Sequence, residues 1–381
     1  MRLTEGKRLI YLDNAATTRP SPGAMKALSR AAECFYNPSS LYKGGLEAEA
    51  LVKNAREEVA RAVGGLPEEI FFTSGGTEGD NLVLASLNPR AAKHVIVSAV
   101  EHDAVIEPAK RLASLGVRVD FAPAGPDGIV SPGAVEALLT PETALVSVMA
   151  VNNETGAVQP VREIARVLKR AKSPALLHTD AVQSFLKTGD APARLGADVV
   201  TVSAHKIHGV KGAGALWVRK GVRLRPQILG GGQERGLRSG TEAVPAILAM
   251  GQACREGFDS LSSRIEKVSA LHAYGAELLR EVPGIEVLSF PTQSPWILTV
   301  SAPGYKSEIL LHALADRGIC VSSGAACSRG RISRVLTAMG VDRRIAEGFL
   351  RVSLSHENEK EDLSALAEAL RALLPALRKA R

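Results

Sequence analysis

The sequence predicts an α/β protein with a mostly parallel sheet and a second, smaller α+β domain. Two observations predict this class: short β-branched runs alternate with helix-length amphipathic segments over the first two thirds of the chain, and this alternation stops in the last third. Alternation at this spacing is typical of parallel sheets covered by helices on both faces. The predicted buried strands are 95–100, 144–151, 175–178, 198–203 and 215–218, and the helices between them are 46–63, 78–87, 104–115, 161–172 and 243–256.

The last third of the chain has the pattern of a smaller α+β unit. Its final predicted helix, 361–379, carries apolar residues along one face, and Pro375 should kink or end it. The other predicted elements are helices at 262–281 and 307–317, and strands at 285–289, 296–301, 319–322 and 349–354.

Length and composition fit this division. At about 150 residues per domain, 381 residues predict two or three domains. We expect a large domain over 16–255 and a small one formed by 1–15 with 256–381. A hydrophobic content of 45% and a charged content of 23% are typical of folded globular chains. No apolar run reaches the roughly 20 residues of a membrane helix, and no apolar leader is visible, so we expect no membrane partner and a cytoplasmic location.

A glycine-rich segment at 73–81 is a candidate phosphate cradle. It joins a strand-like Ile-Phe-Phe run to a predicted helix, whose first N–H groups are free to bind an anion. An ordinary glycine turn with a Ser or Thr cap explains the same letters about equally well. The segment is neither a Walker loop nor G-x-G-x-x-G.

Two charged residues follow neighbouring predicted strands. Asp180 ends an apolar strand, where a carboxylate points toward the ligand crevice of a parallel sheet, although it could also be a helix N-cap. Lys206 directly follows the next buried strand, and a partly desolvated lysine can form a Schiff base, although a solvated loop lysine is the simpler interpretation. A phosphate cradle, an aspartate and a lysine together are what a pyridoxal phosphate site requires.

With these residues in view, the chain resembles the cysteine desulfurases of the class V aminotransferase group, in the branch related to NifS and IscS. The matching motifs run in the expected order along most of the chain, which is far more specific than any one of them. They are 11–18, 37–40, 73–81, 101–102, 151–156, 178–183, 203–206, 230–241, 322–327 and 351–354.

The resemblance implies a pyridoxal phosphate enzyme of fold type I that converts L-cysteine to L-alanine. Lys206 would be the Schiff-base lysine, Asp180 would pair with the pyridinium nitrogen, and His102 would stack on the ring and move protons. The implied cofactor-binding residues are Gly76, Thr77, His102, Asn153, Asp180, Gln183, Ser203, His205, Lys206 and Thr241, and the implied substrate-binding residues are Asn153 and Arg351. No metal is implied.

Cys327 separates this reaction from a plain amino transfer. Arg329, Arg331 and Arg334 follow it within seven residues, and nearby cations favour the nucleophilic thiolate. The resemblance implies that Cys327 takes the substrate sulfur as a persulfide. The remaining cysteines are predicted to be buried structural residues: Cys34, Cys254 and Cys320.

The resemblance also implies partners. In the family, the threonine matching Thr241 reaches the phosphate of a neighbouring subunit, so a homodimer is expected. A sulfur-acceptor protein should receive the persulfide for iron–sulfur cluster, thio-cofactor or tRNA biosynthesis. Departures from the family pattern at Tyr42, at Trp296 and in the short arginine-rich stretch after Cys327 bear on substrate size and acceptor choice.

Three alternatives remain open at this point. A selenocysteine lyase or another class V aminotransferase would use the same cofactor. A metal-dependent hydrolase would use His-x-Asp and His-x-x-His ligand patterns, although Lys206 among them would repel a cation. A nucleic-acid module is disfavoured because the net charge of +7 is dilute over 381 residues and aromatic residues make up only 4%. The four residues of the hydrolase alternative are His178, Asp180, His205 and His208.

Overall fold

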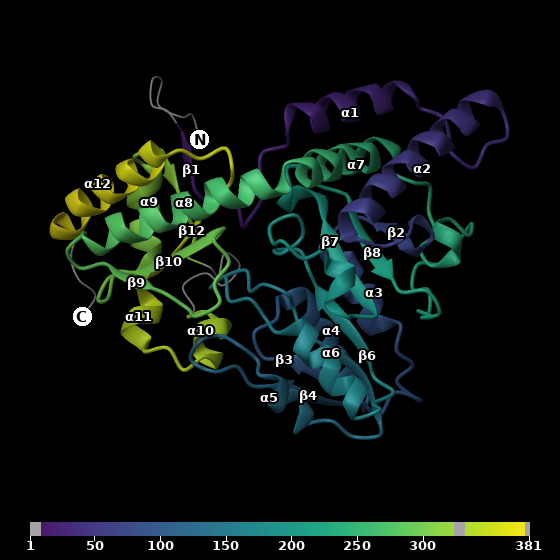
Figure 1. Cartoon of the computed structure of the whole chain (residues 1–381), viewed down its shortest axis with the longest axis horizontal. Coiled ribbons are helices and arrows are strands. Elements are labelled where there is room, and N and C mark those ends of the chain that lie inside the picture. The colour runs from purple at the N-terminus through teal and green to yellow at the C-terminus, as the bar shows by residue number, and fades with distance from the viewer. Residues whose placement is uncertain (1–8, 324–331, 378–381) are drawn as a thin grey trace.

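The computed structural model describes residues 9–323 and 332–377, and a seven-stranded sheet forms the centre of this part of the chain (Figure 1). Its strand order is β2-β8-β7-β6-β5-β3-β4, and neighbouring strands are parallel except where β8 pairs with β2 and β7. This confirms the predicted α/β class. The strands are β2 (Ile70–Thr73), β3 (His94–Ser98), β4 (Arg118–Ala122), β5 (Thr143–Ser147), β6 (Leu176–Asp180), β7 (Val199–Ser203) and β8 (Gly214–Val218).

Helices cover both faces of this sheet, as the unbroken apolar strands predict. On β3, Val95 and Val97 pack in one hydrophobic cluster and Ile96 packs in another, because successive side chains leave a strand on opposite sides. The first cluster includes α3 (Gly76–Ala85) and α4 (Asp103–Ser114). The second includes α1 (Pro22–Glu33), α2 (Lys43–Val63), α5 (Pro132–Glu136), α6 (Val161–Arg170) and α7 (Val244–Asp259).

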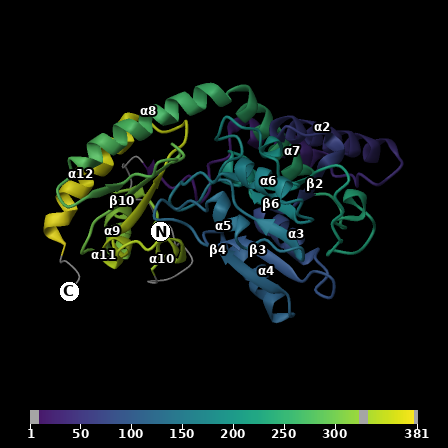
Figure 2. The same cartoon turned by 60° about the horizontal axis from the view of Figure 1, so that its bottom comes forward.

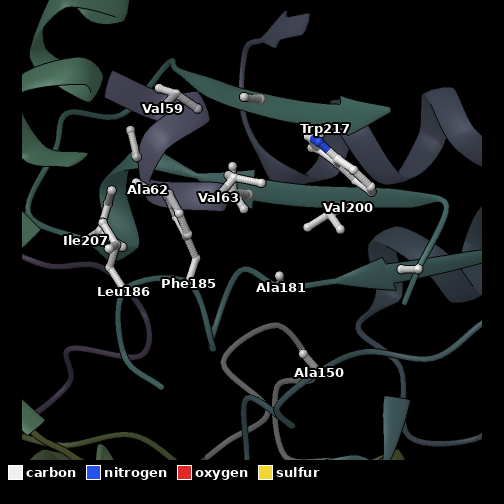
Figure 3. Packing of buried hydrophobic residues seen from close by; sticks show 14 of the residues in the cluster. Val59, Ala62, Val63, Ala150, Ala181, Phe185, Leu186, Val200, Ile207 and Trp217 are labelled. Atoms are coloured by element: carbon white, nitrogen blue, oxygen red, sulfur yellow. The ribbon is translucent and has the colours of Figure 1, made fainter. Parts of the chain in front are cut away.

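The second cluster also anchors the segments that follow β6 and β7. Figure 3 shows Phe185 and Leu186 beside Ile207 and the α2 residues Ala62 and Val63. These five side chains are nearly or fully buried. Since removing a large buried side chain costs about 2–5 kcal/mol, this packing holds both segments firmly in place.

The C-terminal third lies at the left of Figures 1 and 2 and packs around a separate hydrophobic cluster, to which the long α8 helix contributes. Its three-stranded sheet has the order β12-β10-β9, and the N-terminal β1 (Ile10–Tyr11) pairs with β11 (Ile319–Cys320). The domain boundaries stay a prediction. The other elements are α8 (Leu261–Arg280), β9 (Glu286–Leu288), β10 (Ile297–Ser301), α9 (Ser307–Ala315), α10 (Arg334–Ala338), α11 (Arg343–Glu347), β12 (Phe349–Ser353) and α12 (Lys360–Ala376), with 3-10 turns at Pro67–Glu69, Pro192–Leu195, Ala204–Lys206 and Glu234–Gly236.

Several local expectations need correction. The strand predicted over 144–151 ends at Ser147, although the N–H groups of Val148 and Ala150 still bond to carbonyls of β6. Of the cysteines expected to be buried, Cys254 is buried, but Cys34 and Cys320 are half-buried. Cys34 caps the end of α1 rather than lying inside a helix, and Cys320 lies on β11 in the two-stranded β1-β11 sheet. The last helix, predicted over 361–379, ends at Ala376, one residue after the Pro375 that was expected to kink or end it. No helix among the described residues is both long enough and apolar enough to cross a membrane.

Candidate functional site

A cavity of about 570 Å³ lies where β6 and β7 end and α3 begins. Parallel strands present their carboxyl ends at one edge of a sheet, and ligands of open α/β sheets bind at that edge. The N-terminal segment contributes Ala15 and Ala16 to the wall, and β12 contributes Arg351. The cavity is therefore built from both ends of the chain around the edge of the central sheet.

One side of the cavity is suited to an anion. Gly76 and Thr77 line it at the start of α3, where backbone N–H groups have no partner within the helix. The buried hydroxyl of Ser203 has no hydrogen-bond partner among the described residues, and a Cβ added at Gly75 would lie 3.9 Å from its Oγ. An uncommitted donor thus faces the start of the helix. A Cβ at Gly214 would come within 2.7 Å of the Gly75 backbone, so only glycine lets β8 approach this loop.

Asp180 lies at the end of β6 and is buried. Its Oδ1 accepts a hydrogen bond from the N–H of Val182 at 2.8 Å, which is a local turn and not the N-cap of a long helix. Burial raises the pKa of Asp180, and burial together with Asp180 raises the pKa values of Asp80 and Glu101. These three carboxyl groups are buried close together, so their negative charges repel one another. A ligand that places a positive charge beside Asp180 would relieve this repulsion.

Lys206 follows β7 in a 3-10 turn and extends into the same cavity. Its Nζ donates to the carbonyl oxygens of Ala15 at 2.6 Å and Ala16 at 2.8 Å. Burial and the charge of Arg351 lower the pKa of Lys206 to about 8. More of the amine is therefore free near neutral pH than in an exposed lysine, and the free amine is the nucleophilic form.

Gln183 and His102 line the cavity with defined hydrogen-bonding directions. The Nε2 of Gln183 donates to Ala15 O at 2.8 Å, and its Oε1 accepts from Lys187 Nζ at 3.2 Å. His102 is the N-cap of α4, and its Nδ1 accepts from the N–H of Ala104 at 3.1 Å. Because Nδ1 is an acceptor, the neutral ring carries its proton on Nε2.

His205 and Asn153 complete the wall at positions expected from the sequence. Burial, with the charge of Lys206, lowers the pKa of His205 to about 4, so its ring is neutral at ordinary pH. The His205 Nδ1 lies 3.1 Å from the Thr17 hydroxyl. Asn153 lines the cavity, and its backbone oxygen accepts a hydrogen bond from an arginine.

Arg351 is that arginine, and its side chain is only 3% exposed. Its Nη1 donates to Asn153 O at 2.7 Å, and its Nη2 donates to Asp13 Oδ1 at 2.8 Å. Its Nε has no hydrogen-bond partner among residues 9–323 and 332–377. The guanidinium is thus fixed in orientation by two partners and still has a free donor to offer a ligand.

The model of the Aminotransferase class-V family matches residues 10–366, which is nearly the whole chain. The chain belongs to the class-V aminotransferase family. Among curated relatives, it is 36% identical over 385 residues to "Cysteine desulfurase IscS" of Dictyoglomus turgidum, covering 98% of this chain and 96% of that protein.

Two solved structures that resemble this chain agree with this assignment. One "NIFS-LIKE PROTEIN" superimposes with a TM-score of 0.91 at 36% identity, covering 97% of this chain and all of that one. Another, described as "SspA in complex with cysteine", has a TM-score of 0.78 at 31% identity, covering 90% of this chain and 98% of that one.

Four residues of this class-V chain that the sequence singled out are not among the described residues that line the cavity. Cys327 lies outside the described residues, together with Arg329 and Arg331. Thr241 is exposed and is not among the residues that line the cavity. Arg334 does line it, with its guanidinium bonded to the backbone oxygens of Ala99 and Glu101.

The hydrolase alternative loses its ligands in this geometry. Among residues 9–323 and 332–377, no three histidine, cysteine or acidic side chains are placed to share a metal ion. Both ring nitrogens of His178 are already engaged, with the hydroxyls of Ser147 at 2.8 Å and Thr201 at 3.0 Å. Burial lowers the pKa of His178 to about 3, so this histidine is a neutral part of the sheet interior.

The sequence did not point to Asp13, Lys187 or the carbonyls of Ala15 and Ala16. No sequence pattern could have identified the two carbonyls, because every residue has a backbone oxygen. A pattern that could have identified Lys187 is present: it is a lysine four residues after Gln183 and directly after the apolar pair Phe185 and Leu186.

Proposed function

We propose that the chain is a pyridoxal phosphate-dependent cysteine desulfurase, which converts L-cysteine to L-alanine and takes the sulfur onto Cys327. The observation that carries the proposal is the convergence, in one cavity, of an amine of lowered pKa, a buried carboxyl group and an anion cradle. Lys206, Asp180 and the start of α3 supply these three groups. The names of the curated relatives and the cysteine bound to one structural neighbour support the same reaction.

The residues present fit this cofactor. Gly76, Thr77, Ser203 and His205 would hold the phosphate, and the uncommitted Ser203 hydroxyl is the donor that such a group would satisfy. Asp180 would pair with the protonated ring nitrogen, while Gln183, Asn153 and His102 would border the ring. When bound, pyridoxal phosphate withdraws electrons from the substrate Cα and so makes its proton removable.

The remaining chemistry belongs to the side chains of this chain. Arg351 orients the substrate carboxylate, and the amine of Lys206 removes the Cα proton. His102 exchanges the thiol proton through Nε2. The substrate C–S bond breaks with its electron pair left on the carbon fragment, which is protonated to alanine. The sulfur bonds to the Cys327 thiolate, which is oxidised to the persulfide as the carbon is reduced.

We also propose that the enzyme is a homodimer and delivers its persulfide to an acceptor protein. Thr241 is exposed on the single chain and would reach the phosphate of the partner subunit. Large apolar side chains are exposed near it and on the α1–α2 connection, which favours burial against a second copy. They include Leu229 at 79%, Phe35 at 82% and Leu41 at 91% exposure. The cytoplasmic location and the identity of the acceptor stay predictions.

The decisive experiment combines a spectrum with product analysis. Purified protein loaded with pyridoxal phosphate should show the visible absorbance of lysine-bound cofactor, and adding L-cysteine should change it while alanine and sulfide appear in equal amounts under a reductant. Selenide formed from selenocysteine, with no sulfide from cysteine, would instead indicate a selenocysteine lyase. Amino transfer to a keto acid without sulfide would indicate an aminotransferase.

Replacing Arg351 by lysine should weaken substrate binding more than turnover. Lysine keeps the charge but loses the planar fork that fits a carboxylate. A hydrogen bond to a charged group contributes about 1.5–3 kcal/mol, so Arg351→Lys should raise the KM for L-cysteine about 10- to 100-fold with a smaller change in kcat. Steady-state sulfide release measures both constants.

The matched control is Arg343→Lys on α11. Arg343 also pairs with a carboxylate, Glu347 at 2.8 Å, but its side chain is 79% exposed and lies away from the cavity. Its KM should equal that of the unchanged enzyme. A normal KM in Arg351→Lys would show that another group holds the substrate carboxylate.

A further inference from the structure

A second lysine, Lys187, lies behind the wall of the cavity and is only 5% exposed. Its Nζ donates to Gln183 Oε1 at 3.2 Å. Within the described part of the chain, no carboxylate lies within salt-bridge distance of this amine. Burying a lysine without an acidic partner costs free energy, so stability alone gives no reason for its presence.

The surroundings of Lys187 increase this cost. Burial and the charges of Lys206 and Arg351 lower its pKa to about 7. His205 and His208 also face its charge, and Arg264 lines the small cavity beside it. An apolar residue would fill the same place at lower cost, which suggests that the amine has a task in the site.

Hydrogen-bond polarity identifies the task. The Lys187 amine donates to the carbonyl oxygen of Gln183, and in its protonated form it can accept no hydrogen bond from the amide nitrogen. The opposite end of the amide faces Ala15 O, which only accepts. Ala15 O also accepts from Lys206, so Lys187, Gln183, Ala15 and Lys206 form one continuous chain of hydrogen bonds.

We propose that Lys187 is a positioning residue that locks the Gln183 amide with its NH2 group on the cavity side, as a donor to the bound cofactor. The inference rests on the proposed cofactor. Gln183 lines the cavity, and its Nε2 has a second proton beyond the one given to Ala15. Without the lysine, Gln183 Oε1 is left buried without a partner, and only the bond from Nε2 to Ala15 O still holds the amide.

The backbone around Lys187 is built to hold this arrangement. Trp296 Nε1 donates to Lys187 O at 2.7 Å, and the Lys187 amine lies 5.9 Å from the centre of the Trp296 ring. Trp296 is buried, and Phe185 and Leu186 anchor the preceding residues (Figure 3). The tryptophan that departs from the family pattern therefore supports Lys187 from behind and does not line the substrate cavity.

A double-mutant cycle on cofactor binding tests the proposal without using turnover. Full-length protein is stripped and titrated with pyridoxal phosphate, and the dissociation constant is measured for the unchanged chain, Lys187→Met, Gln183→Leu and the double variant. Lys187→Met removes the hydrogen-bond donor to Gln183 and should raise the dissociation constant for pyridoxal phosphate about fivefold. A typical hydrogen bond changes a binding constant by about this factor. The lysine change should have no further effect once Gln183 is leucine. The visible absorbance of the loaded Lys187→Met protein should also shift.

Two controls separate positioning from a packing role. Lys267→Met on α8 removes a half-buried lysine paired with Glu359, which does not line the cavity, and should leave cofactor affinity unchanged. If Lys187→Met does not fold, Lys187→Gln, which keeps an N–H donor, replaces it in the cycle and should show a smaller coupling of the same sign.

An unchanged affinity of Lys187→Met for pyridoxal phosphate would overturn the proposal. So would a loss of affinity from Lys187→Met that is as large in the presence of Gln183→Leu as in its absence. A change in melting temperature alone, with normal affinity and spectrum, would do the same. The proposed function fails on a different result, namely that the unchanged protein takes up no pyridoxal phosphate or releases no sulfide.

Discussion

Lys206→Ala should abolish sulfide release, lowering kcat by roughly 10⁴-fold or more, the scale seen when a residue central to covalent catalysis is removed. The reason is specific to this amine. It is the group of lowered pKa that reaches the cavity at the end of β7, and alanine provides neither a nucleophile nor a base there. The measurements are the absorbance of protein incubated with pyridoxal phosphate, which should lack the lysine-bound band, and sulfide released from L-cysteine.

Lys211→Ala is the matched control, because Lys211 lies five residues further along the same segment and is exposed. It should load cofactor and release sulfide normally. Lys206→Ala will also lose two hydrogen bonds to the N-terminal segment, so a fall in melting temperature of the apoprotein is expected. If Lys206→Ala kept the visible band while Lys211→Ala lost it, the attachment residue would be misassigned.

The parts of the fold that the sequence revealed are those whose side chains are uniformly buried. β6 and β7 read as apolar runs because both of their faces are covered. β4 was missed because Arg118 and Phe121 are exposed at the sheet edge, which breaks the apolar run. The five-residue helices α5, α10 and α11 are too short to show a period.

The site divides in a similar way between what was predictable and what was not. Asp180 and Lys206 follow adjacent buried strands, so strand order alone brings them to one edge. The contacts that tune them come from remote sequence: Lys206 bonds to Ala15, which is 191 residues away, and Arg351 bonds to Asp13. These contacts depend on where β1 and β12 lie relative to the edge of the central sheet. No local sequence pattern predicts that placement.

Cys327→Ala should leave the cofactor site intact and remove sulfur transfer. The variant should bind pyridoxal phosphate with the affinity and spectrum of the unchanged enzyme, because the residues proposed to hold the cofactor, Lys206 and Asp180 among them, are unchanged. Sulfide release from L-cysteine should fall by roughly 10³-fold or more, since the proposed nucleophile is gone. Mass spectrometry after one turnover without reductant should show one added sulfur atom on the unchanged chain and none on the variant.

Cys254 and Cys320 provide the control, because their surroundings disfavour the thiolate. Burial and the charge of Asp13 raise the pKa of the Cys320 thiol, and burial raises that of Cys254. Raised pKa values keep these thiols protonated, whereas the arginines that flank Cys327 in sequence favour the reactive form. Cys320→Ala should therefore keep full sulfide release and still gain the sulfur on Cys327. Turnover that survives Cys327→Ala but is lost in Cys320→Ala would move the nucleophile to the β11 strand and overturn the assignment made from the sequence.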